Sequence, residues 1–186
     1  MKKNEYLTIP NLMGYFRILL IPVFLYLYYH AESMKEYRIA FCVLIVSFLT
    51  DLFDGKIARK FNMVSDFGKM LDPIADKLTQ GAMAIAISFR IPAMVYFVVL
   101  FACKEFYMGI MGLYILKKYN KMNMAQMFGK VSTVLLDVAV LVLLFFTNID
   151  FSVANVIIGV MTASVIFSWV RYIIYHVNEI KELKSA

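Results

Sequence analysis

Long apolar stretches alternate with short polar connections along this chain, and this pattern predicts a helical membrane protein. A helix needs about 20 mostly apolar residues to cross a bilayer, and six stretches come close to that length. They cover, approximately, residues 11–29, 37–61, 66–89, 91–116, 128–147 and 151–177. We therefore expect an all-α integral membrane protein with six transmembrane helices.

Composition agrees with a membrane protein. Of the 186 residues, 62% are hydrophobic and 17% are charged, whereas a soluble domain is nearer half apolar. We find no linker-like segment and no internal repeat, so we expect residues 1–186 to form a single membrane domain. Within it, residues 1–9, which precede Pro10, are expected to form a short segment at the membrane interface.

Lys2 and Lys3 precede an apolar run, as at the start of a secretory signal. That run is longer than the apolar region of a signal, and no small-residue cleavage site follows it. We therefore expect it to remain as a membrane helix.

The lysines and arginines are distributed unequally between the two sets of helix ends. Ten flank one set (Lys2, Lys3, Lys56, Arg59, Lys60, Lys117, Lys118, Lys121, Lys181 and Lys184) and three flank the other (Lys35, Arg38 and Arg90). Because cytoplasmic ends carry the excess of positive charge, we expect a multi-pass protein of the cell membrane with both termini in the cytoplasm. The same rule accounts for the net charge of +6 without a nucleic-acid partner.

The cysteines and histidines suggest no separate site. Cys42 and Cys103 lie in apolar runs, and we expect both to be buried as small hydrophobic residues. His30 and His176 are expected at the membrane interface.

Residues 50–77 interrupt the apolar pattern with five aspartates, five lysines or arginines and two glycines. Asp51 and Asp54 are three residues apart, and Asp72 and Asp76 are four apart, so each pair would share one face of a helix. The pairs fall at the expected cytoplasmic ends of the second and third helices. A short connection makes those helices antiparallel neighbours, and we expect the four carboxylates to converge.

Four converging carboxylates repel one another unless a cation is present. Their oxygens suit hard divalent ions such as Mg²⁺, Mn²⁺ or Ca²⁺, and two such ions about 4 Å apart are a known device for displacement at phosphate esters. The alternative is a solvated loop whose acids pair with the nearby lysines and arginines. The fifth aspartate, Asp66, is expected to cap the third helix.

Small residues accompany the acids. Gly55, Ala58 and Gly68 would allow either a ligand or a neighbouring helix to approach closely, and these residues alone do not decide between the two. Arg59 can bind a phosphate or act as a cytoplasmic anchor.

One pattern contains all of these positions: Asp51-x-x-Asp54-Gly55-x-x-Ala58-Arg59, then Gly68-x-x-x-Asp72-x-x-x-Asp76. It resembles the signature of the CDP-alcohol phosphotransferase family, and the flanking sequences resemble the bacterial phosphatidylglycerophosphate synthase and cardiolipin synthase branches. The resemblance implies six membrane helices in a homodimer, and the distribution of lysine and arginine places the active site at the cytoplasmic ends of the second and third helices. The resemblance also implies transfer of a phosphatidyl group from CDP-diacylglycerol to an alcohol, with release of CMP.

The resemblance also assigns roles to the aspartates. Asp51, Asp54 and Asp72 would bind one Mg²⁺ or Mn²⁺ ion, and Asp51, Asp72 and Asp76 would approach a second. Asp76 would also be the general base. The small residues would line the cytidine pocket, and Arg59 would lie near the donor phosphates.

The acceptor is less well defined. Phosphatidylglycerophosphate synthases usually carry an Arg-Glu pair in the fourth span and another Arg seven residues later, whereas this chain has Lys104-Glu105 and Gly112. Lysine lacks the planar fork that grips a phosphate. We place glycerol 3-phosphate first as acceptor and phosphatidylglycerol, the acceptor of a cardiolipin synthase, second.

Four cations are candidate contacts of the acceptor or of phosphates: Arg17, Lys104, Lys130 and Arg171. Glu105 is expected to pair either near Lys104 or with Arg17. A remote alternative to an enzyme is a cation transporter, because acids in membrane helices also mark ion paths. That alternative leaves the spacing of the glycines and Arg59 without an explanation.

Overall fold

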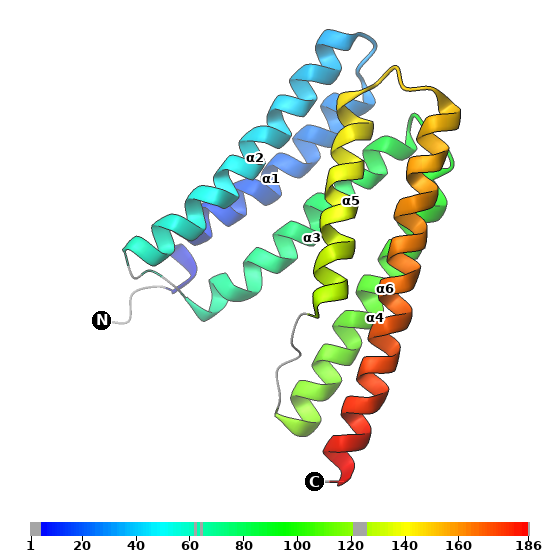
Figure 1. The fold of residues 1–186 in the computed structure, drawn as a ribbon. Coiled ribbons are helices and arrows are strands. Elements are labelled where there is room, and N and C mark those ends of the chain that lie inside the picture. The colour runs from blue at the N-terminus through cyan, green and yellow to red at the C-terminus, as the bar shows by residue number, and fades with distance from the viewer. Residues whose placement is uncertain (1–4, 62, 64, 121–125, 186) are drawn as a thin grey trace. The chain divides into compact units, whose positions relative to one another are not determined.

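The computed structural model describes residues 5–61, 63, 65–120 and 126–185, and all regular secondary structure within them is helical. The elements in order are η1 (Glu5–Leu7), α1 (Ile9–Tyr29), α2 (Met34–Lys60), α3 (Asp66–Ser88), α4 (Met94–Tyr119), α5 (Met127–Phe145) and α6 (Phe151–Ser185) (Figure 1). Each predicted apolar segment coincides with one helix, so the all-α prediction is confirmed. The 3-10 helix η1 lies in the predicted interfacial segment, of which residues 1–4 are outside the described part.

Four of the described helices, α1, α4, α5 and α6, are long and apolar enough to cross a membrane. Helices α2 and α3 carry the charged stretch, which lowers their apolar character. At 1.5 Å per residue, α6 is about 52 Å long, more than the hydrocarbon thickness of a bilayer. An integral membrane protein fits these helices, while a count of six spans stays a prediction.

The first 89 residues form one compact unit, in which α1 packs against both α2 and α3 (Figure 1). Among the described residues, no comparable packing joins α2 directly to α3, so the prediction that these two helices are direct neighbours is wrong. One reason for this arrangement is that α1, rather than α2, can approach α3 very closely. A β-carbon on Gly14 would lie 2.8 Å from Leu71 Cδ2, so only glycine fits there without a shift.

The starts of α1, α2 and α3 follow local sequence signals. The Thr8 hydroxyl accepts the backbone N–H of Asn11 at 3.4 Å, and Ser33 and Glu36 form a capping box, a reciprocal pair that satisfies free N–H groups of the first turn. Helix α3 is capped by Ser65, whose Oγ accepts the Gly68 N–H at 3.0 Å. The prediction that Asp66 is this cap is wrong by one residue, because the chain is still extended at Ser65 and is already helical at Asp66.

Residues 90–186 form the second compact unit, in which α6 packs against α4 and α5. The Tyr172 ring of α6 lies so close to Gly129 of α5 that a β-carbon there would overlap it. Next to this contact, the Ser164 hydroxyl donates a hydrogen bond to Ser132 Oγ at 3.0 Å. Small and hydroxylated residues therefore bring the two helices together, as is usual for helices in membranes.

Three of the minor predictions are wrong. His176 is fully buried, with its Nδ1 3.3 Å from the Tyr107 hydroxyl, because that part of α6 packs against α4 rather than ending at an interface. Cys42 and Cys103 are both free and exposed on outward helix faces, as apolar residues on membrane helices commonly are.

Candidate active site

The guanidinium group of Arg17 lies among the four clustered aspartates. Its Nη1 donates hydrogen bonds to Oδ1 of Asp51 and to Oδ1 of Asp76, the latter at 2.7 Å. Its Nη2 lies 3.8 Å from Asp54 Oδ2 and 4.0 Å from Asp72 Oδ1. The predicted convergence of the two aspartate pairs is therefore confirmed, and the cation at its centre comes from outside the charged stretch.

Three helices bring these groups together. Asp51 and Asp54 lie one turn apart toward the C-terminal end of α2, and Asp72 and Asp76 lie one turn apart within the first half of α3. Spacings of three and four residues place each pair on one helix face. Arg17 lies in α1, the helix that packs against the other two, so one side chain reaches all four carboxylates.

Burial differs sharply within the cluster. The side chains of Arg17 and Asp54 are only 3% and 5% exposed, whereas those of Asp72 and Asp76 are 53% and 51% exposed. Arg17 Nε, Arg17 Nη2 and Asp54 Oδ2 are buried without a hydrogen-bond partner among the described residues. Leaving a buried polar atom without a hydrogen bond costs about 1–3 kcal/mol, and the ion pair between Nη2 and Asp54 Oδ2 at 3.8 Å is longer than a hydrogen bond, so these atoms favour an additional ligand at this place.

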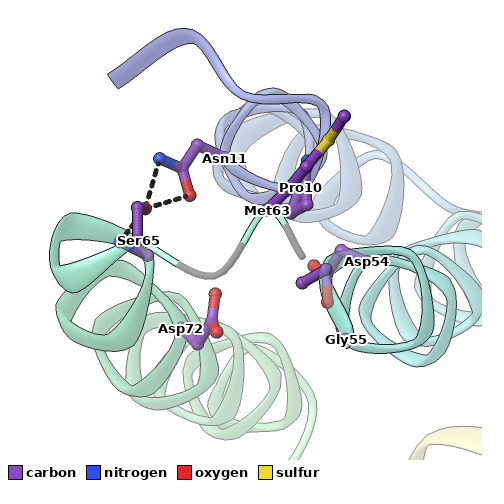
Figure 2. Close-up of a pocket in the computed structure, with 9 residues that line it drawn as sticks. Pro10, Asn11, Asp54, Gly55, Met63, Ser65 and Asp72 are labelled. Carbon is purple, nitrogen blue, oxygen red and sulfur yellow. Dashed lines mark hydrogen bonds between the residues drawn. The ribbon is translucent and has the colours of Figure 1, made fainter. Parts of the chain in front are cut away.

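A pocket adjoins the cluster at the C-terminal end of α2 and the start of α3. It is lined by Pro10, Asn11, Asp54, Gly55, Ala58, Met63, Ser65, Gly68 and Asp72, around about 310 Å³ of empty space that includes its open side. Figure 2 shows Asp54 and Asp72 projecting into this space from α2 and α3. Five of the eight signature positions found in the sequence therefore line one pocket of the first unit.

The two signature glycines have different surroundings. A β-carbon on Gly68 would lie 2.7 Å from Asn11 Oδ1 and 3.1 Å from Ser65 Oγ, so any larger residue here would force these two side chains to shift. Among the described residues, a β-carbon on Gly55 would meet only Arg59 Nη2, at 3.9 Å, which is an ordinary contact. Packing therefore explains Gly68, whereas the absence of a side chain at Gly55 leaves its backbone accessible from the pocket.

Arg59 is exposed, and its guanidinium lies near Gly55, one of the residues that line the pocket. Ala58 lines the pocket one turn after Asp54. Both positions agree with the predicted nucleotide-binding group. That these residues bind a nucleotide stays a prediction.

Asn11 and Ser65 form a wall of the pocket that sequence reasoning missed. Asn11 Nδ2 donates a hydrogen bond to Ser65 Oγ at 3.1 Å, and this oxygen also accepts the Gly68 N–H (Figure 2). Asn11 is only 3% exposed, so this contact ties the start of α1 to the start of α3. The available signals were a polar residue directly after Pro10 and a serine one turn before Gly68.

The chemistry of the four aspartates fits hard divalent ions, because carboxylate oxygens are the donors that Mg²⁺ and Mn²⁺ prefer. Asp54 Oδ2, which is buried and has no hydrogen-bond partner among the described residues, is the atom that most favours such a ligand. In the part of the chain that the structure describes, no group of three or more His, Cys, Asp or Glu side chains is arranged to hold a metal ion. The Arg17 guanidinium lies between the carboxylates, and the predicted ligand set stays a prediction.

The remaining candidate cations belong to the second unit. Lys104 is 7% exposed, and its Nζ lies 2.7 Å from Glu105 Oε1, which confirms the first of the two partners expected for Glu105. Lys130 and Arg171 are exposed, and the Arg171 guanidinium carbon lies 5.5 Å from the centre of the Phe128 ring. A contact of these three cations with an acceptor stays a prediction.

Comparisons with known proteins give a family and named relatives. The family described as CDP-alcohol phosphatidyltransferase matches residues 7–175. A 78-residue part of the chain is 44% identical to a CDP-diacylglycerol--glycerol-3-phosphate 3-phosphatidyltransferase of Rickettsia typhi, covering 42% of this chain and 43% of that protein. A 73-residue part is 42% identical to the protein of the same name from Escherichia coli K12, covering 38% of each chain.

A third relative has a different name. An 88-residue part is 36% identical to a cardiolipin synthase (CMP-forming) / mitochondrial hydrolase fusion protein of Schizosaccharomyces pombe, covering 47% of this chain and 14% of that protein. The chain thus spans about two-fifths of the length of the first two relatives and a smaller share of the third.

Proposed function

This chain belongs to the CDP-alcohol phosphatidyltransferase family, and from this premise we propose that it transfers a phosphatidyl group from CDP-diacylglycerol to an alcohol and releases CMP. The observation that carries the proposal is the pocket in which Asp54, Gly55, Ala58, Gly68 and Asp72 face one space beside the aspartate cluster. A nucleotide in this pocket would place its phosphates next to the carboxylates.

The aspartates are the proposed holders of two divalent ions, Mg²⁺ or Mn²⁺. Asp51, Asp54 and Asp72 would bind the first, and Asp51, Asp72 and Asp76 would approach the second. When bound, such ions neutralise the pyrophosphate and make CMP a better leaving group. Asp54 Oδ2, buried and without a hydrogen bond in the part of the chain that the structure describes, supports this ligand set.

Asp76 is the proposed general base. Its side chain is half exposed and lies within the cluster, so an acceptor hydroxyl can reach it. Asp76 would take the hydroxyl proton while the acceptor oxygen bonds the phosphorus that carries the diacylglycerol. The bond from that phosphorus to the bridging oxygen of the pyrophosphate then breaks, and CMP departs with this oxygen.

The donor nucleotide is the proposed occupant of the pocket. Gly55 lines the pocket without a side chain and so permits close approach, Ala58 adds a small wall, and Gly68 leaves room for the Asn11–Ser65 contact. Arg59, near Gly55, would bind a donor phosphate.

Glycerol 3-phosphate is the proposed acceptor, which makes the activity that of a phosphatidylglycerophosphate synthase. The names of the Rickettsia and Escherichia relatives support it. Candidate contacts for the acceptor phosphate are Arg17, Lys104, Lys130 and Arg171.

Phosphatidylglycerol is the second candidate acceptor. Lys104 shares its charge with Glu105 at 2.7 Å and has no planar fork for a phosphate, and Gly112 has no side chain to add one. The similarity to the cardiolipin synthase fusion protein supports the same alternative.

The proposed setting is a homodimer in the cell membrane, with six spans, both termini and the active site on the cytoplasmic side. The distribution of lysine and arginine supports the orientation, and family membership supports the dimer.

The deciding experiment measures CMP release by the purified protein with CDP-diacylglycerol and Mg²⁺ or Mn²⁺. Release that depends on glycerol 3-phosphate supports the first acceptor, and release that depends only on phosphatidylglycerol supports the second. An absence of release with every alcohol, from protein whose folding is verified, refutes the transferase.

A further inference from the structure

Arg17 supplies a positive charge at the centre of a cluster of aspartates. Four aspartates surround it, so the cluster carries four formal negative charges against the single positive charge of the guanidinium. Close carboxylates disfavour one another's ionised form. The side chains of Arg17 and Asp54 are only 3% and 5% exposed, so water cannot replace this charge beside Asp54, and the buried part of the cluster depends on Arg17 when it holds no other cation.

The two terminal nitrogens of the guanidinium are engaged differently: Nη1 is hydrogen-bonded, whereas Nη2 makes only the longer ion pairs with Asp54 and Asp72, at 3.8 and 4.0 Å. Nη1 donates both hydrogen bonds, to Asp51 and Asp76, while Nη2 and Nε donate none within the described residues. Arginine has five N–H donors, and leaving buried donors unused is unfavourable. A purely structural arginine would be expected to use more of them, so this arrangement fits a group that exchanges partners.

We propose that Arg17 is the internal counter-cation of the aspartate cluster: it holds the carboxylates together without divalent ions, and it competes with those ions for Asp51 and Asp76. The competition rests on the proposed function, because it requires the cluster to bind divalent ions. The counter-cation role itself rests only on the ion pairs.

The proposal has a consequence for the proposed reaction. A group bound by Asp51 and Asp76 must displace Nη1 from both, which frees more N–H donors of Arg17. These N–H groups stay buried beside the pocket, where a phosphate of a bound substrate would accept them. Arg17 is then a positioning residue that changes partners between the metal-free and the loaded protein.

The test is thermal unfolding of the purified full chain in detergent, in EDTA and across a titration with MgCl₂ or MnCl₂. Arg17→Gln is compared with wild type and Arg17→Lys, and Arg38→Gln, at an exposed position of α2, is the matched control. Arg17→Gln should unfold several degrees below wild type in EDTA, and saturating metal should close the gap. Its stabilisation by metal should have a midpoint roughly tenfold lower in metal concentration, which corresponds to about 1.4 kcal/mol of removed competition.

Two controls separate the possible failures. Arg17→Lys should lie between wild type and Arg17→Gln, and Arg38→Gln should match wild type. The proposal is overturned if the difference in unfolding temperature between wild type and Arg17→Gln is the same in EDTA and in metal and the midpoint of the metal titration is unchanged. Arg17 is then only structural.

A wild type that gains no stability from metal overturns the competition and the proposed metal site, but not the ion pairs. In that case the double variant Arg17→Gln/Asp51→Asn tests the counter-cation role. It also provides the test if Arg17→Gln alone yields no folded protein. Removing one acid should restore part of the stability that Arg17→Gln loses. No restoration overturns the counter-cation role.

Discussion

Replacing each signature glycine by alanine tests the different roles that the pocket assigns to them. Gly68→Ala puts a methyl group 2.7 Å from Asn11 Oδ1 and 3.1 Å from Ser65 Oγ. Asn11 can yield only by loosening its hydrogen bond to Ser65, and such a bond contributes about 0.5–1.5 kcal/mol. With the loosened hydrogen bond counted as part of it, the cost of overpacking at this position is about 1–3 kcal/mol.

Gly55→Ala is the matched variant. Its methyl group meets only Arg59 Nη2 at 3.9 Å, so no overpacking arises, and alanine improves helix stability by about 0.5–1 kcal/mol. Both variants share this helix gain to some degree, so their difference isolates the contact with Asn11. For a chain of this size, a difference of about 1–3 kcal/mol separates the two unfolding temperatures by about 2–12 °C.

The assay is thermal unfolding of both variants in the same detergent, followed by CMP release at varied CDP-diacylglycerol. Gly68→Ala should unfold at the lower temperature, while Gly55→Ala should unfold at or above the wild-type temperature and show a raised KM for the donor. In an Asn11→Ala background, Gly68→Ala should cost almost nothing, because the clashing group is gone. Equal unfolding temperatures for the two single variants would refute the packing assignment of Gly68.

Three further predictions concern the aspartates and the cap of α3. Asp76→Asn should abolish CMP release while leaving the unfolding temperature near that of wild type; substantial remaining turnover would remove the general-base assignment. Asp51→Ala should eliminate the stabilisation by CMP that depends on Mg²⁺ or Mn²⁺, as measured by thermal shift; an unchanged shift would contradict the proposed ligand set. Ser65→Ala should lower the free energy of unfolding by about 1 kcal/mol or more, because it removes the cap of α3 and the partner of Asn11. Asp66→Ala should lower it less, and the opposite order of the two unfolding temperatures would contradict the observed cap.

Helix positions were predictable because they follow from local pattern. An apolar run of about 20 residues forms a helix in a membrane irrespective of its neighbours, since the backbone must satisfy its own hydrogen bonds there. The signature residues were also predictable, because Asp51, Asp54, Asp72 and Asp76 lie on two segments at helical spacing. Errors arose where the choice was between adjacent residues, as for Ser65 and Asp66, or concerned the outward or inward face of a helix, as for Cys42 and Cys103.

The sequence by itself therefore determined the helices, the pairing of acids along each helix and the family. Only the tertiary structure decided what lies between the acids, because that depends on which helix packs between α2 and α3. Gly14 lets α1 approach α3 closely, and this approach carries Arg17 to within 4.0 Å of all four carboxylates. Arg17 is 34 residues from Asp51 and 59 from Asp76 in the chain, so no local pattern indicates the contact. Charge and close packing between distant segments, rather than periodicity, place this cation at the site.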